Sequence, residues 1–161
     1  MDATVDVNGT LRGSPAKLAV DFQGAQQPTQ EPVWLLKNAD IRLGDNHINA
    51  MIKIDQALAG QVNIDLPRLV QLWPGLAGKA SGEIKLAGSL DEPLAVAQLQ
   101  GNGITYDGQR VGKLTLQGKL LPKQRADFTF DAERIWSAKQ KSVRCILMGK
   151  AALSRTVVSC H

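Results

Sequence analysis

The sequence predicts an all-β protein: a curled, mostly antiparallel and repetitive sheet that forms a groove, with one short helix near residues 67–73. Three observations lead to this prediction. Aliphatic and polar residues alternate through most of residues 1–131, which is typical of strands with one apolar and one solvated face. Turn residues separate the alternating runs. A short phrase, aliphatic-x-Gly-x-aliphatic, also recurs along the chain and indicates a repeated structural unit.

The recurring phrase has the two-residue period of a strand, so its two aliphatic side chains lie on one face. It occurs four times, with its glycines at Gly9, Gly60, Gly88 and Gly118. From the second copy onward these glycines are 28 and 30 residues apart. Arrays of such units form long surfaces, so we expect an extended sheet rather than a small compact one.

Alternation predicts about nine or ten strands in chain order. It is clearest at residues 5–7, 18–22, 41–43, 48–54, 62–66, 84–86, 114–116 and 128–130. Turns are expected at residues 13–15, 44–46, 91–93 and 107–108, where Gly, Pro, Asp and Asn gather. Residues 25–32 are polar and contain two prolines, which predicts a connector between strands.

Residues 67–74 break the alternation. Leu69, Val70 and Trp73 have helical spacing, Pro67 suits a first helical position and Pro74 ends the segment. We therefore expect one or two helical turns that plug an edge or an end of the sheet.

The composition changes near Ser137 and divides the chain into residues 1–137, the repetitive sheet, and residues 138–161, a basic tail. The tail has five Lys or Arg residues, no Asp or Glu, and both cysteines, Cys145 and Cys160. Two interpretations stay open. The tail is translated out of the native frame, in which case the cysteines carry no meaning, or it is a disordered basic tail whose cysteines could pair in an oxidising compartment.

Charge and motifs exclude several classes of function. The net charge of +4 comes from the last 30 residues, without the interleaved aromatic residues of a nucleic-acid surface, so no nucleic-acid partner is expected. No nucleophile elbow, phosphate-binding loop or metal-spaced Cys/His cluster occurs, and His47 beside a turn is expected to be solvated. We expect no enzyme activity, no catalytic residues, no metal and no cofactor. The sequence shows no pattern of a signal peptide or of a membrane-spanning segment, so we expect neither within this stretch of chain.

The apolar stripe of the strands is the remaining candidate site. One interpretation is the inner face of a closed sandwich. The other is a continuous trough for acyl chains, whose burial is worth about 0.8 kcal/mol per methylene. The residues expected to line the trough are Val20, Phe22, Ile41, Leu43, Ile52, Ile54, Val62, Ile64, Ile84, Leu86, Leu114 and Leu116.

Residues 34–46, 59–78, 80–90 and 103–106, with Leu72-Trp73-Pro74-Gly75-Leu76 as the most specific part, resemble the TamB family of translocation and assembly module proteins. This family belongs to the AsmA-like, repeating-β-groove group of lipid transfer proteins. The resemblance covers residues 3–137. It implies a long sheet curled into a β-taco with an apolar interior, in a periplasmic protein whose parent chain is anchored in the inner membrane.

The resemblance also implies a role in outer-membrane biogenesis. The groove would carry phospholipid between the inner and outer membranes and support assembly of outer-membrane proteins and autotransporters with the barrel partner TamA. Nascent outer-membrane proteins would be further partners. We expect the chain to be a fragment of such a protein, without the anchor and the outer-membrane-facing domain. The alternatives are a scaffold that pairs its edges with nascent barrel strands, without lipid transport, and a non-functional truncated product.

Overall fold

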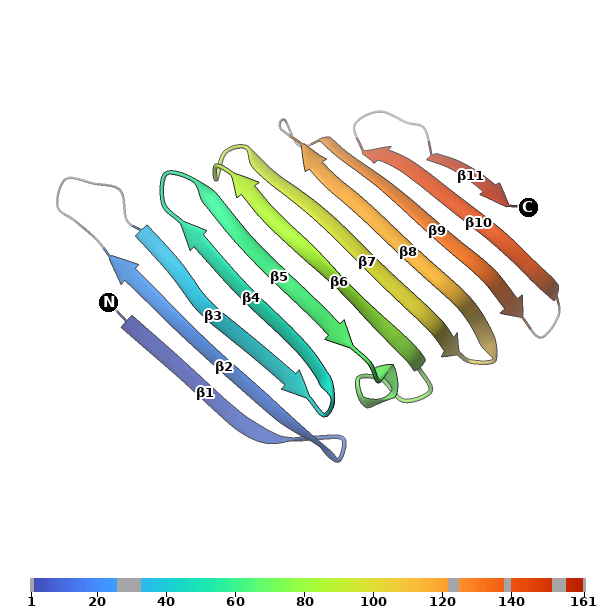
Figure 1. The fold of residues 1–161 in the computed structure, drawn as a ribbon, viewed down its shortest axis with the longest axis horizontal. Coiled ribbons are helices and arrows are strands. Elements are labelled where there is room, and N and C mark those ends of the chain that lie inside the picture. Colours follow the sequence, from blue (N-terminus) through green and yellow to red (C-terminus); the bar gives the residue numbers. More distant parts are fainter. Residues whose placement is uncertain (1, 26–32, 122–124, 138–139, 152–155, 161) are drawn as a thin grey trace.

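The computed structural model describes residues 2–25, 33–121, 125–137, 140–151 and 156–160, with the backbone alone at Arg125 and from Ser137 onward. Eleven strands and one short 3-10 helix form the fold (Figure 1). Their bounds are β1 (Asp2–Leu11), β2 (Ser14–Ala25), β3 (Val33–Leu43), β4 (Asn46–Ile54), β5 (Leu58–Leu66), η1 (Leu69–Gln71), β6 (Ala77–Gly88), β7 (Pro93–Tyr106), β8 (Gln109–Leu121), β9 (Arg125–Ser137), β10 (Gln140–Ala151) and β11 (Thr156–Cys160).

All eleven strands form one sheet in sequence order, from β1 at one edge to β11 at the other. Each strand pairs antiparallel with the next, so the sheet is a simple meander (Figure 1). The predicted all-β class and antiparallel pairing are confirmed, with one or two strands more than expected. Short turns such as Gly44-Asp45 make this possible, because antiparallel neighbours need only a tight connection.

The predicted curl is wrong for this chain, because the sheet is a single open layer (Figure 1). Curling a sheet requires bulges or staggered register at repeated positions. Here register shifts occur only at Asp21/Phe22, at Leu36/Ala39, at Ala77/Lys79 and in the β9–β10 ladder. The other ladders keep one register over their whole length, so little bends the strands toward one another.

The predicted short helix is present as η1, a single turn in the β5–β6 connection (Figure 1). The backbone N–H groups of Leu72 and Trp73 both donate to the Leu69 carbonyl oxygen, at 3.0 and 3.1 Å. Pro74 and Gly75, whose φ is +82°, then turn the chain away from helical geometry. The helix, at three residues, is therefore at the short end of the one or two turns that the spacing of Leu69, Val70 and Trp73 predicts.

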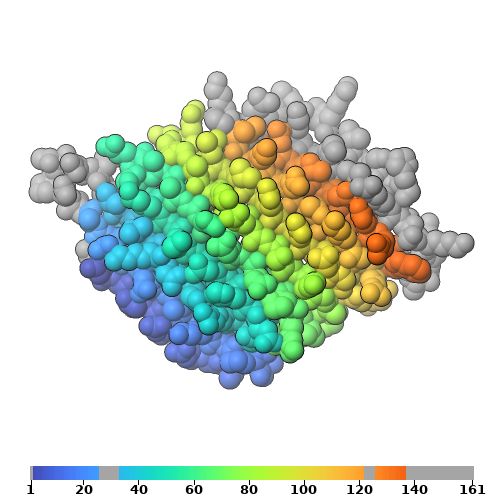
Figure 2. Space-filling model, in the orientation of Figure 1, coloured from blue at the N-terminus to red at the C-terminus, as the bar shows by residue number. Residues whose placement is uncertain are grey.

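No second layer covers the described strands, and one face shows them as adjacent bands (Figure 2). The accessible surface is 11254 Å², whereas a compact monomer of 17.4 kDa would expose about 7,900 Å². Among the described residues, only Leu69 and Ala132 are buried apolar side chains, and neither is fully shielded from solvent. The closed sandwich considered above is therefore wrong: the sheet has no closed core.

The strand pattern continues past the predicted domain boundary at residue 137, in the backbone of β10 and β11. Cys145 lies opposite Cys160 in the register of these two strands. The division into residues 1–137 and 138–161, and the reading frame of the second part, stay predictions. Residues 26–32 of the predicted connector lie outside the described residues.

Candidate functional site

One face of the sheet is apolar from β1 to β9. Three rows of register partners cross these nine strands, and every position in them is apolar or glycine. The first row is Val7, Leu18, Ile41, Ile48, Ile64, Gly82, Leu99, Leu116 and Phe130. The second row is Val5, Val20, Ala39, Ala50, Val62, Ile84, Ala97, Gly118 and Phe128. The third row is Ala3, Phe22, Leu36, Ile52, Gly60, Leu86, Ala95, Leu120 and Ala126.

We call these three rows the apolar face. With strands about 4.8 Å apart, it extends about 38 Å across the sheet. Most of its side chains are half-buried by their neighbours on the same face, and Val5, Val7 and Ile41 are 44–53% exposed. A continuous apolar surface of this extent is unusual on a soluble chain, which makes it the candidate binding surface.

Alternation and register place all twelve predicted trough residues on this side of the sheet. Nine belong to the three rows, and Leu43, Ile54 and Leu114 lie next to the rows. The structure thus brings the predicted set together. Binding of lipid by this set stays a prediction, because it would have to be tested by contacts between these residues and a bound lipid.

Several residues of the apolar face were missing from the predicted set although they obey the same alternation. Leu18, Ile48 and Leu99 lie in the first row, and Phe128 and Phe130 end two rows on β9. Their aliphatic or aromatic type at two-residue spacing is the signal that could have identified them. The register, which the sequence does not contain, is what joins them into rows.

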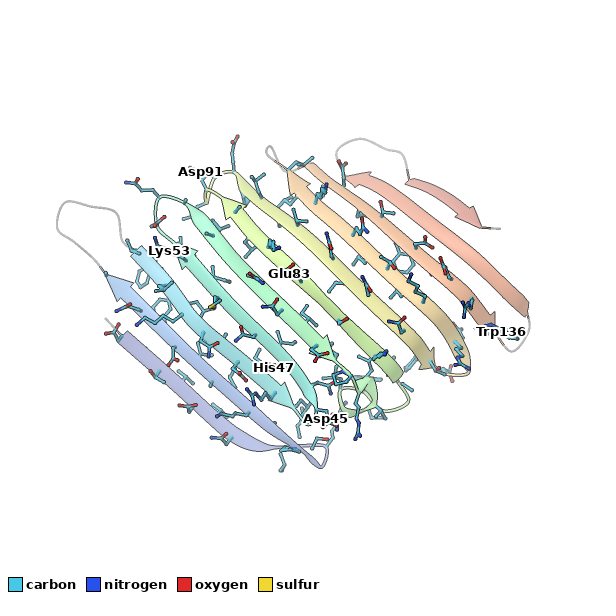
Figure 3. All side chains as sticks on the ribbon, viewed as in Figure 1. Asp45, His47, Lys53, Glu83, Asp91 and Trp136 are labelled. Atoms are coloured by element: carbon cyan, nitrogen blue, oxygen red, sulfur yellow. The ribbon has the colours of Figure 1, made fainter. Side chains whose placement is uncertain are left out.

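The opposite face is polar. One of its rows crosses the same nine strands through Asn8, Lys17, Arg42, His47, Asp65, Ser81, Gln100, Thr115 and Asp131. Glu83, which is labelled in Figure 3, accepts a hydrogen bond from Gln61 at 2.7 Å and pairs with Lys85 at 3.2 Å on this face. Solvent and such contacts suit the polar face, whereas within the described strands the apolar face is left without a partner of matching chemistry.

Asp40 has the most elaborate electrostatic surroundings on the polar face. Arg42 donates two hydrogen bonds to its carboxylate, at 2.8 and 3.0 Å, and His47 Nε2 lies 3.0 Å from Asp40 Oδ2. The hydrogen bonds from Arg42 hold the pKa of Asp40 below its usual value, against the opposing effect of burial, and His47 adds to the lowering. Asp40 and Arg42 thus form an ion pair on the polar face, with His47 beside them.

A shallow hollow of about 650 Å³ lies across β3 to β6. Most of its lining belongs to the polar face of the sheet, including Met51, Lys53, Gln61 and Lys85, so the hollow is not part of the apolar face. On the apolar face, a Cβ added to Gly60 would lie 3.0 Å from the Met51 carbonyl oxygen and 3.1 Å from Ile52 Cγ1. This glycine of the recurring phrase therefore allows close packing of β4 beside β5.

The segment around η1 closes one end of the sheet over the middle strands. Asn46, buried to 2% exposure, accepts a hydrogen bond from the Arg68 backbone N–H at 3.1 Å, and its Nδ2 lies 2.9 Å from the Arg68 carbonyl oxygen. Arg12 from the β1–β2 turn donates to the Leu72 carbonyl oxygen at 2.6 Å and stacks on Trp73 at 5.0 Å. The predicted plug is thus present and held by specific contacts.

The described residues hold no group of three or more His, Cys, Asp and Glu side chains that could bind a metal ion. Within that same part of the chain, no helix has the length and apolarity needed to cross a membrane.

Comparison with known proteins gives two matches. The family described as "TamB, N-terminal domain" matches residues 3–146. The translocation and assembly module subunit TamB of Haemophilus influenzae is 24% identical over 115 residues, which cover 71% of this chain but only 9% of that relative. No solved structure matches significantly. The family is named for a component of a translocation and assembly module and not for an enzymatic activity. Since the family match spans most of its length, the chain belongs to the TamB family, to the part described as its N-terminal domain.

Proposed function

We propose that the apolar face binds the acyl chains of phospholipids, as part of a periplasmic protein that carries phospholipid between the inner and outer membranes. One observation carries the proposal: three rows of apolar residues cross nine strands without a polar interruption and without a covering layer among the described residues. Acyl chains need non-directional burial, and such a surface offers it.

The free energy expected from burying an acyl chain on this face fits transient binding. Full burial of a chain of about 16 carbons would contribute roughly 10 kcal/mol, and an open sheet covers about half of the chain, which leaves roughly 5 kcal/mol. Because the rows repeat similar aliphatic contacts from strand to strand, a chain that moves along them would lose little contact energy. Weak, uniform binding of this kind suits movement along the sheet better than storage.

In the longer protein, this surface would serve outer-membrane biogenesis. We propose that this role is assembly of outer-membrane proteins, including autotransporters, with the barrel partner TamA. The name of the relative, a translocation and assembly module subunit, supports a role in assembly. Nothing in the described residues resembles an active site, and we propose no catalytic role.

Arginine substitution tests the lipid proposal. We expect Ile64→Arg or Leu86→Arg to lower extraction of a fluorescent phospholipid from vesicles at least tenfold, because a guanidinium would stand among aliphatic side chains. Asn63→Arg is the matched control, since it adds the same charge on the polar face of the same strand, and should extract lipid normally. Normal extraction by a folded Ile64→Arg variant, with its circular dichroism unchanged, would contradict the proposal.

A second candidate function uses the edge of the sheet. All ten residues of β1 are exposed, and in the described structure this strand pairs only with β2. An open edge can accept a strand from another protein, so β1 could pair with nascent outer-membrane strands. Crosslinks from β1 to such strands, with none to lipid from Ile64, would favour this function over lipid binding.

A further inference from the structure

The apolar face is large enough for a stable contact with a second protein surface. Its first and third rows lie about four residues apart along each strand, so with its side chains the face is about 18 Å wide and about 38 Å long. Two such faces packed together would bury about 1,400 Å² in total, which is within the range of stable protein–protein interfaces. The three rows hold no polar or charged side chain, so a surface of the same chemistry can cover them without leaving a polar group unpaired.

The sizes of the side chains in the first and third rows are matched to each other. On β1, β5, β7 and β9 the first row carries a large apolar residue, and the third row carries alanine or glycine. These pairs are Val7 and Ala3, Ile64 and Gly60, Leu99 and Ala95, and Phe130 and Ala126. On β6 the order is reversed, with Gly82 in the first row and Leu86 in the third.

A two-fold axis that lies over the second row, across the strands, would turn this size pattern into contacts. Such an axis places the first row of one copy over the third row of the other copy, and the reverse. Ile64 of one copy would then lie over the space at Gly60 of the other, and Leu99 over Ala95. Packed sheets lie about 10 Å apart with their side chains interdigitated, which this arrangement allows.

The match is most useful near the middle of the nine strands. Packed sheets are usually rotated by about 30°, and this rotation displaces the outer strands more than the central ones. The matched pairs on β5, β6 and β7 are adjacent and close to the centre, so they stay in contact. Acyl chains adapt to any apolar surface and do not require matched sizes, whereas a rigid second sheet does.

We propose that, in the absence of lipid, two copies of this chain pack apolar face against apolar face as a symmetric dimer. The inference goes beyond lipid binding, because it assigns the same face a protein partner. The second copy and an acyl chain would compete for the face. The dimer would therefore keep the apolar rows out of water until lipid replaces the second copy.

The mass of the full chain in solution tests the dimer. Light scattering during gel filtration, over a wide range of concentrations, should give twice 17.4 kDa and fall toward 17.4 kDa on dilution. Ile64→Arg should be monomeric throughout, because it places a guanidinium from each copy in the interface. Asn63→Arg adds the same charge on the polar face of β5 and should remain dimeric. Circular dichroism checks that each variant is folded.

Ala95→Leu separates a matched interface from non-specific adhesion of apolar surfaces. It fills the space that Leu99 of the second copy would occupy, so it should weaken the dimer about tenfold although it makes the face more apolar. Non-specific adhesion would instead become stronger with the added apolar area. Val96→Leu, on the polar face of the same strand, is the matched control and should leave the dimer unchanged.

Three results would overturn the proposal. The first is a chain that is monomeric at every concentration. The second is a folded Ile64→Arg variant that remains dimeric, because its copies would then associate through an edge such as β1. The third is stronger association of Ala95→Leu, which would show that the contact has no matched geometry.

A short-chain lipid separates this inference from the proposed function. Dioctanoyl phosphatidylglycerol, used below its critical micelle concentration, should bind the unaltered chain and dissociate the dimer. A monomer that binds this lipid would overturn the dimer and leave the lipid-binding function standing. A dimer that behaves as expected in all variants but binds no lipid would support the dimer and contradict the lipid-binding function. A dimer that binds the lipid without dissociating would overturn the shared face.

Discussion

At the scale of single residues, Asn46 fixes the segment around η1 to the β3–β4 turn. It is the buried polar residue of the described chain, and its Nδ2 lies within hydrogen-bond distance of Leu43 O, Arg68 O and Gln71 Oε1, at 3.1, 2.9 and 3.0 Å. Its Oδ1 accepts from the Arg68 N–H. A buried amide with these partners specifies one arrangement, because each partner would be left unsatisfied in another.

Asn46→Ala should therefore lower the free energy of unfolding by about 2 kcal/mol, since it leaves the Arg68 backbone groups without their partner. Urea titration followed by circular dichroism measures the change. The control is Asn63→Ala, an exposed amide on the polar face, which should change stability by less than about 0.5 kcal/mol. Equal effects of the two substitutions would show that the Asn46 contacts do not hold the plug.

Two glycines of the apolar face differ in the space around them. A Cβ on Gly82 would overlap the backbone oxygen of Gln98, whereas a Cβ on Gly118 would meet only the Ala97 Cβ, at 4.0 Å. Gly82→Ala should destabilise the sheet by about 1–3 kcal/mol through forced backbone shifts. Gly118→Ala should be neutral or stabilise by up to about 1 kcal/mol, because it restricts the unfolded chain. Thermal unfolding of both variants checks this, and a stable Gly82→Ala variant would contradict the close packing of β6 on β7.

At the scale of elements, alternation located most of the strands before Ser137, because these strands have one wet and one apolar face. The predicted runs did not include β7, and β10 and β11 lie in the segment that was expected to be a basic tail. The sequence also located η1 through Pro67, Pro74 and the spacing between them. It did not predict the open shape, because curvature depends on register shifts such as the one between Leu36 and Ala39, which arise from pairing and not from composition.

At the scale of the whole molecule, the sheet is an amphipathic layer whose apolar side has no protein partner among the described strands. Its area exceeds that of a compact monomer by about 3,400 Å², which is the surface that a covering layer or a ligand would otherwise remove from water. The all-apolar rows that cross nine strands are the basis of our proposal that this face binds a long apolar ligand. The TamB family membership of residues 3–146 is consistent with such a surface in a longer protein.

The central claim is that this face, and not its opposite, contacts lipid. The most direct measurement places a photo-crosslinking amino acid at Ile64 in one variant and at Asn63 in another, adjacent positions on opposite faces of β5. Each variant is produced in the periplasm of a Gram-negative cell, irradiated and analysed by mass spectrometry. We expect phospholipid adducts at position 64 and none at position 63. Equal adducts at both positions, or adducts only at position 63, would contradict the assignment of the apolar face as the lipid-binding surface.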